Sequence, residues 1–360
     1  MFNRQNIEVI GMIMKGFSGV SEITRGLILL VCFLTLSAST FATTNEVHPG
    51  IVVTTFKPGV TDKDIQKILD ASTNGCEIVL PPGKIKVSQP IILQHSYQTL
   101  RGAADESTIL YLANNANCPV IIMGQPVNHP MQTVRHLCVS DLYIDGNRFH
   151  QQRELWKEQG EGSEIRNNGV TVQNVSDSLI ENVTCTRCRS GGLVTTLGVR
   201  RLNVENFASS DNEFDGLACY LTMDSVFSRL NLHDNPGAGI SLDLAFDHNV
   251  IKNAILSGND LGIFMRDSRN NNFEDVSIHN SRDFGVFMAQ AFEPVVNGVR
   301  AQQDTECSDN SFTNLVAIRN GRADFRVNDI SCTNNVIIGA QFNGTVRALS
   351  APIPDLVTVK

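Results

Sequence analysis

Three side chains with complementary acid–base chemistry recur at intervals of 23 residues: Tyr220, Asp243 and Arg266. A carboxylate can abstract or return a proton, and a phenol can relay one. A guanidinium can stabilise the negative charge that develops when a proton leaves a carbon next to a carboxylate. The alternative is an exposed Asp–Arg ion pair without function, worth at most about 1 kcal/mol. We treat these residues as candidate catalytic residues, provided that the fold makes them neighbours.

The spacing of the glycines predicts such a fold. Glycines recur every 23 or 24 residues, and each is followed by a short segment whose first and third residues are mostly apolar, as in a strand with one buried side. They are Gly169, Gly192, Gly216, Gly239, Gly262 and Gly285. Helical repeats would need heptad-like spacing and propeller blades about 40 residues. The sequence therefore predicts an all-β chain, a single-stranded right-handed parallel β-helix whose turns stack about 4.8 Å apart.

Further rows of residues repeat in step with the glycines. Two rows predicted to point inward are Ile180, Val204, Phe227, Val250 and Phe273, and Cys185, Ser209, Leu232, Ile255 and Ile278. The second and fourth residues after each glycine are expected to point outward, Phe264 among them. Cys185 and Cys219 fall in inward rows, so buried thiols are expected there. Cys307 with Cys332 is the pair to test first for a disulfide.

The first 42 residues are typical of an export signal. Arg25 precedes an apolar run, residues 26–36, that is too short to span a membrane, and small residues follow up to Ala42. An uncleaved membrane anchor is the alternative. We expect a secreted or periplasmic monomer without membrane contact after cleavage. The net charge of −8 and the absence of a Lys/Arg run argue against a nucleic-acid partner.

Residues 43–360 are expected to form one β-helix domain. An amphipathic helix at about 61–71 would cap the first turn, and regular turns would extend over about 169–290. Loop insertions at about 147–167 and 291–306 interrupt the period, and such loops often wall a binding groove; plain decoration is the alternative. The candidate substrate-binding residues are Trp156 in the first insertion, Phe264, Asp267, Gln290 and Asp215.

Acidic residues crowd the corner that precedes the strand. Asp211 and Asp234 share one offset, and Asp260 and Asp283 share another. Like charges at this spacing repel each other unless they are solvated or bridged by a cation. Solvated turn residues are the simpler interpretation, so no metal or cofactor is expected, with calcium as the alternative.

Parts of the sequence resemble known β-helix proteins. The segment DIQKILDASTNGCEIVLPPGKIKVSQPIILQ, residues 64–94, resembles the first turns of pectate-lyase-like proteins. The span from about 142 to 290, with SGGLVTTLG, DNEFDGLACYLTMDSVF and HDNPGAG, resembles the catalytic modules of mannuronan C-5-epimerases. The resemblance implies a β-helix with a polysaccharide groove over the outward face of the strand that follows each repeat glycine.

The sequence departs from that family at the residues that matter most. Val194 and Thr196 stand where the resemblance places the aspartate and histidine of an Asp-Pro-His motif, and Tyr220 stands where it places another acid. The family's catalytic residues therefore do not carry over to this chain.

These observations favour an exported epimerase- or lyase-type enzyme that acts on an acidic polysaccharide. A noncatalytic carbohydrate-binding surface protein is the first alternative. A glycoside hydrolase is the second, and it would need two carboxylates, Asp243 with Asp267 or Asp215. We expect Arg266→Ala to abolish activity or weaken glycan binding while the fold stays intact.

Overall fold

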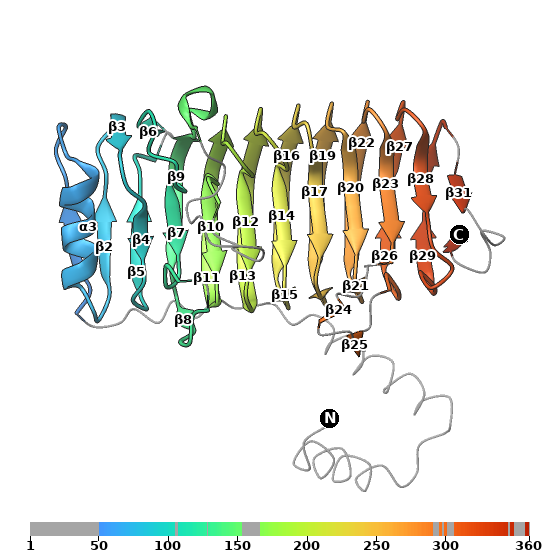
Figure 1. Cartoon of the computed structure of the whole chain (residues 1–360), viewed down its shortest axis with the longest axis horizontal. Coiled ribbons are helices and arrows are strands. Elements are labelled where there is room, and N and C mark those ends of the chain that lie inside the picture. Colours follow the sequence, from blue (N-terminus) through green and yellow to red (C-terminus); the bar gives the residue numbers. More distant parts are fainter. Residues whose placement is uncertain are drawn as a thin grey trace, which may run out of the picture. The chain divides into compact units, whose positions relative to one another are not determined.

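In the computed structural model, residues 51–360 form one unit, a coil of stacked parallel strands (Figure 1). The structure describes residues 50–104, 107–127, 129–152, 166–290 and 306–344, together with short strands at 295–296, 299–300, 346–348 and 357–359. The predicted signal segment, Trp156 and most of both predicted insertions lie outside these residues. The expected all-β parallel coil is confirmed. Among the helices in the described residues, none has the length and apolar character needed to cross a membrane.

One sheet carries the candidate catalytic row. In the described part of the chain it has ten strands, each paired in parallel with the strand of the next turn. They are β4 (Ile91–Leu93), β7 (Ile121–Met123), β10 (Val170–Gln173), β12 (Leu193–Thr196), β14 (Leu217–Tyr220), β17 (Ala238–Asp243), β20 (Leu261–Arg266), β23 (Phe284–Ala289), β28 (Ala323–Val327) and β31 (Val346–Ala348).

The remaining parallel strands belong to a second sheet, of twenty strands within the described residues. They are β1 (Val52–Thr55), β2 (Cys76–Val79), β3 (Gly83–Val87), β5 (Gln98–Arg101), β6 (Thr108–Leu112), β8 (Val134–Arg135), β9 (Cys138–Asp145), β11 (Val175–Thr186), β13 (Val199–Ser210), β15 (Thr222–Met223), β16 (Val226–His233), β18 (Phe246–Asp247), β19 (Val250–Ser257), β21 (Ser268–Arg269), β22 (Asn272–His279), β26 (Ser311–Thr313), β27 (Val316–Ile318), β29 (Asn335–Ile338), β30 (Gln341–Phe342) and β32 (Val357–Val359). An antiparallel pair, β24 (Val295–Val296) and β25 (Val299–Arg300), and a 3₁₀ turn, η1 (Arg148–His150), lie outside this pattern.

Helix α3 (Asp62–Ala71) lies at the first turn, as the fold prediction expected. Thr61 begins it with a capping box, in which the Thr61 side chain and Asp64 each bind the other's backbone N–H. Ile65 and Leu69 are fully buried against the core. The Gln66 amide accepts a hydrogen bond from Ile92 N at 2.8 Å and donates one to Ile92 O at 3.2 Å. The helix thus satisfies part of the open edge that β4 would otherwise expose.

The core is built from rows of apolar side chains, one from each turn. On the ten-stranded sheet the pairs Leu217/Cys219, Ile240/Leu242 and Ile263/Met265 are inaccessible to solvent, as predicted. Cys185 and Cys219 are buried free thiols, which confirms their predicted state. Cys307 and Cys332 are also buried and free, and the Cys307 thiol donates a hydrogen bond to Ala289 O at 3.5 Å.

For two residues of the predicted inward rows, the prediction is wrong by one position. Val250 is half-buried and Ile255 is 53% exposed, whereas Ile251 and Leu256 are fully buried. The registers agree, because Phe227 pairs with Ile251. The preceding corner holds one extra residue, with positive φ at both Leu244 and Ala245 (51° and 62°), and the next corner is correspondingly one residue shorter. The two changes in corner length cancel, so the glycines stay 23 residues apart and their spacing does not reveal the shift.

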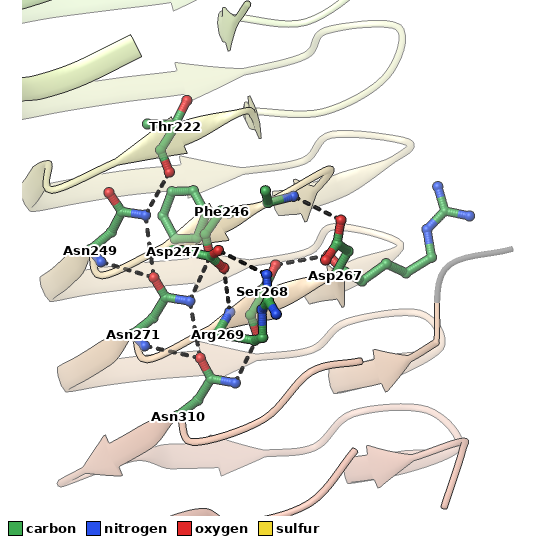
Figure 2. A network of polar contacts seen from close by, with 11 residues as sticks. Thr222, Phe246, Asp247, Asn249, Asp267, Ser268, Arg269, Asn271 and Asn310 are labelled. Atoms are coloured by element: carbon green, nitrogen blue, oxygen red, sulfur yellow. Dashed lines mark hydrogen bonds and ion pairs between the residues drawn. The ribbon is translucent and has the colours of Figure 1, made fainter. Parts of the chain in front are cut away.

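Buried asparagines form a hydrogen-bonded ladder along one corner of the coil. Figure 2 shows Asn249, Asn271 and Asn310 stacked on one another, with each amide nitrogen donating to the oxygen of the next residue at 3.2 and 3.0 Å. Each nitrogen also donates to a backbone carbonyl of the preceding turn, for example Asn271 to Phe246 O at 2.8 Å. A second ladder joins Asn212 to Asn235 and Asn235 to Asn259, both at 3.0 Å. All these asparagine side chains are buried, at most 1% exposed.

We expect Asn271→Ala to lower the free energy of unfolding by about 2–4 kcal/mol. The change leaves Asn249 N and Phe246 O buried without the partners that Asn271 now provides. Urea unfolding followed by circular dichroism measures the loss. Asn231→Ala, at an exposed asparagine of β16, is the control and should change stability by less than about 0.5 kcal/mol. Equal effects of the two substitutions would contradict a structural role for the ladder.

Candidate functional site

The structure places the three candidate catalytic residues in adjacent turns. Tyr220 on β14 pairs directly with Asp243 on β17. Arg266, at the end of β20, reaches back one turn and donates from Nη2 to Asp243 Oδ2. A phenol, a carboxylate and a guanidinium thus follow one another along the outward side of the ten-stranded sheet.

Asp243 is held in a fixed, ionic arrangement. Its side chain is 6% exposed, against 35% for Arg266. Oδ1 accepts a hydrogen bond from Leu244 N at 2.9 Å, so both carboxylate oxygens have donors. Burial raises the pKa of Asp243 above its ordinary value, and the Arg266 charge opposes this rise without reversing it. With both oxygens engaged, Asp243 is better suited to orient Arg266 than to abstract a proton.

A pocket of about 340 Å³ opens beside Tyr220. Its lining comes from two consecutive strands of the ten-stranded sheet, β12 and β14, from residues that precede β10, β12 and β14, and from Leu244 directly after β17. The lining residues are Arg166, Ser190, Gly191, Val194, Phe214, Asp215, Ala218, Tyr220 and Leu244. Phe214 and Leu244 are each more than 40% exposed and give the pocket an apolar rim. The pocket therefore combines an apolar mouth with a few converging polar groups, the usual character of a small-molecule site.

Asp215 is the titratable carboxyl group of this pocket. It directly precedes the repeat glycine Gly216, and its Oδ1 accepts a hydrogen bond from Ala238 N at 2.7 Å in the next turn. Burial raises the pKa of Asp215 from an ordinary value near 3.8 to about 6, against the lowering effect of that hydrogen bond and of the Arg166 charge. A carboxylate with such a pKa is ionised at neutral pH and can still take up a proton readily.

Tyr220 faces the same pocket in its neutral form. Burial is the main cause that raises the pKa of its phenol, and the charges of Asp215 and Asp243 raise it further. Arg166 and a hydrogen bond with Ser241 act in the opposite direction and are weaker. The phenol therefore keeps its proton at neutral pH, so the pocket holds a group that has a proton to give.

The sequence did not single out Arg166, Phe214 or Leu244, and it assigned Asp215 a binding role, with a catalytic role in the hydrolase alternative alone. Arg166 lies near the end of the first predicted insertion, and such insertions often wall a binding groove, so its position could have marked it. Among the residues directly before the repeat glycines, namely Asn168, Gly191, Asp215, Ala238, Leu261 and Phe284, Asp215 alone is ionisable. That exception in an otherwise uncharged row could have marked it.

The other predicted binding residues lie elsewhere. Asp267 is buried at the corner that follows β20, where Figure 2 shows it beside Ser268 and Arg269, and its Oδ2 accepts a hydrogen bond from Ala245 N at 3.0 Å. Burial raises the pKa of Asp267 to about 6, but the residue does not line the pocket. Gln290 is exposed after β23, and its backbone N–H donates to Asp329.

The acidic corners have the geometry of turns. Asp211 and Asp234 adopt positive φ, 57° and 55°, a conformation that Asp tolerates better than most residues. Within the described ranges, no three His, Cys, Asp or Glu side chains converge as a metal site would require.

The Arg266–Asp243 pair changes the expected effect of Arg266→Ala. Removing the guanidinium leaves a buried carboxylate without its cation, so we expect a loss of stability on the order of 1–3 kcal/mol rather than an intact fold. Adding Asp243→Asn should recover most of that loss, as urea unfolding of the two variants can measure. Arg200→Ala, which breaks the exposed pair with Asp224, is the control and should cost less than about 1 kcal/mol. A double variant no more stable than Arg266→Ala would count against this explanation.

The fold and its registers define a right-handed parallel β-helix. A family model described as a right-handed beta helix region matches residues 110–260. The A-module of the mannuronan C-5 epimerase AlgE4 from Azotobacter vinelandii is 16% identical with a TM-score of 0.65, over 83% of this chain and 90% of that chain. An alginate lyase from Paenibacillus sp. str. FPU-7 is 12% identical with a TM-score of 0.56, over 85% and 99%.

A fragment of a bacteriophage protein has a similar fold. The N-terminal fragment of bacteriophage Phi29 gene product 12 is 16% identical with a TM-score of 0.60, over 84% of this chain and 53% of that chain. No curated protein matches the sequence. At these identities the similarities establish a common fold, and the chemistry has to be argued from the site.

Proposed function

We propose that this protein acts on an acidic polysaccharide and that it abstracts the proton beside a uronate carboxylate, in the manner of an epimerase or a lyase. The observation that carries the proposal is the pairing in one pocket of Asp215, whose pKa is raised to about 6, with Tyr220, which stays protonated. One group is ready to accept a proton and the other to donate one. The structural relatives that act on polysaccharides are consistent with this.

Each side chain has a distinct role in the proposed reaction. The Asp215 carboxylate accepts the C5 proton, and the electron pair of the broken C–H bond moves into the sugar carboxylate. Arg166, which also lines the pocket, stabilises the resulting charge. Tyr220 then donates its proton. Delivery to C5 from the opposite face inverts that carbon, whereas delivery to the O4 leaving oxygen breaks the glycosidic bond and leaves a C4–C5 double bond.

Asp243 and Arg266 do not take part in the proton transfer of this proposed reaction. Arg266, oriented by Asp243, offers a cation to the carboxylate of the neighbouring sugar residue. Hydrolysis is not proposed, because glycoside hydrolases use two facing carboxyl groups. Of the described residues that line the pocket, Asp215 is the one carboxylate, and Asp267 lies at a separate corner.

A noncatalytic glycan-binding role is the second candidate. It is favoured by Val194 and Thr196, which occupy the positions where the resemblance places an aspartate and a histidine.

Export belongs to the proposal as well. We propose that residues 1–42 direct the chain out of the cytoplasm and that the mature protein, residues 43–360, is a soluble monomer that needs no metal. Sequencing the N-terminus of the protein recovered from the culture medium or periplasm tests the cleavage. Equal activity with calcium and with a chelator tests the independence from metal.

Assays on defined polymers separate the candidates. The purified mature protein is incubated with alginate, pectate and a neutral glucan. A lyase produces ultraviolet absorbance from unsaturated sugar ends, and an epimerase exchanges the C5 proton with deuterated solvent. Binding to the acidic polymers without either signal would favour the second candidate, and a new reducing end without unsaturation would indicate a hydrolase.

A further inference from the structure

The outward face of the ten-stranded sheet changes character beyond Arg266. At the second residue after each repeat glycine, the turns beside the pocket carry the small side chains Val194, Ala218 and Ser241. The next two turns carry Phe264 and Phe287, which pair in register on β20 and β23. Figure 1 shows these strands as consecutive rungs of the same sheet.

The rings of Phe264, Phe287 and Phe284 form one aromatic surface. Phe264 and Phe287 are stacked with centroids 5.9 Å apart and planes only 6° from parallel. Phe284 extends the surface, with its centroid 5.1 Å from that of Phe287. All three side chains are half-buried, so one part of each packs on the sheet and the other meets solvent.

A guanidinium stands at each end of this surface. Arg266 lies over the Phe264 ring at 5.1 Å, and Arg322 lies over the Phe284 ring at 5.8 Å. Arg322 is 74% exposed and pairs with Asp283 at 2.9 Å. A guanidinium has five N–H donors, so one carboxylate partner leaves donors for another anion. We name Arg266, Phe264, Phe287, Phe284 and Arg322 the aromatic strip.

We propose that the aromatic strip is an extended binding site for further residues of an acidic polysaccharide whose reacting residue lies in the Tyr220 pocket. A uronate ring has an apolar C–H face that suits a phenyl ring and a carboxylate that suits a guanidinium. The strip offers both, with three phenyl rings between two guanidinium groups. This inference rests on the proposed function for its substrate class, and it adds the direction in which the polymer runs.

The distances suit a polymer rather than a single sugar. Three strand spacings separate Tyr220 on β14 from Phe287 on β23, which amounts to about 14 Å along the coil. A short oligomer held in the pocket cannot reach Phe287, whereas a longer one spans both. The affinity should therefore depend on chain length, and Phe287 should contribute to long ligands alone.

Calorimetric titration of the full mature protein with alginate oligomers of two and six residues tests the strip. We expect Phe287→Ala to raise the Kd of the hexamer about five- to ten-fold and that of the dimer less than two-fold. Arg322→Gln should weaken the hexamer and flatten the dependence of its Kd on salt. Tyr111→Ala removes an aromatic ring that Lys84 covers on the other sheet, and it is the control expected to change neither Kd.

The two proposals fail in different ways. The titrations are made in the Asp215→Asn background, in which no turnover is expected, and conversion is assayed separately on the wild type. A protein that binds long oligomers through Phe287 without converting them retains the strip and loses the proposed chemistry. Equal effects of Phe287→Ala on dimer and hexamer, or no effect, overturn the strip. The same holds if sedimentation shows that the strip joins two copies of the chain, or if a neutral glucan hexamer binds as tightly as the alginate hexamer.

Discussion

Asp215→Asn is expected to abolish turnover and, at the same time, to stabilise the folded protein at pH 7. The amide cannot accept the C5 proton, so the loss of turnover should reach about 10²–10⁴-fold. The amide oxygen can still accept the hydrogen bond from Ala238 N, so the local backbone geometry is retained. Because burial raises the pKa of Asp215 to about 6, the folded state disfavours its charge, and the neutral amide removes that cost.

The raised pKa of Asp215 also predicts how the stability of the folded protein changes with pH. The pKa of Asp215 is near 3.8 when unfolded and about 6 when folded, so folding takes up a proton between these values. The unfavourable contribution is complete above pH 6 and vanishes below pH 4, and it amounts to about 1–3 kcal/mol. Relative to the Asn variant, the wild type should gain stability as the pH falls from 6 to 4, as urea unfolding at several pH values can measure.

Activity should depend on the same ionisation. For the wild type, kcat/KM on the active polymer should rise as the pH increases through about 6, because the carboxylate is the base. Asp211→Asn, at an exposed corner near the pocket, is the matched control and should keep both the pH profile and the stability of the wild type. A fully active Asp215→Asn variant would remove this residue from the mechanism.

The repeat was readable from sequence because one physical rule acts in every turn. A glycine before each strand and an alternation of apolar residues fix which side faces the core, and stacking follows from the constant length. That reasoning was sufficient to align Tyr220, Asp243 and Arg266 before any coordinates. It failed at Val250 and Ile255, because two compensating changes in corner length cancel in the count.

The pocket could not be derived in the same way. Asp215 and Arg166 belong to corners, and a corner's side-chain direction depends on individual φ values rather than on the period of the strand. The buried asparagine ladder was missed for a related reason. Asn is common at exposed turns, and the sequence does not tell a hydrated amide from one that donates to Asn310 of the next turn.

Tyr220→Phe is expected to reduce turnover about 10²–10⁴-fold while the protein still binds its polymer. The substitution removes the proton that the neutral phenol donates and retains the ring that lines the pocket. The charges of Asp215 and Asp243 help to keep the phenol neutral in the wild type. Phe is also neutral, so the fold should tolerate the substitution. The comparison to make is kcat and Kd of wild type and variant on the same polymer, with Tyr143→Phe on β9 as the control. A lowered affinity with unchanged kcat would mean that the phenol only binds the sugar, and the proposed reaction would then need another proton donor.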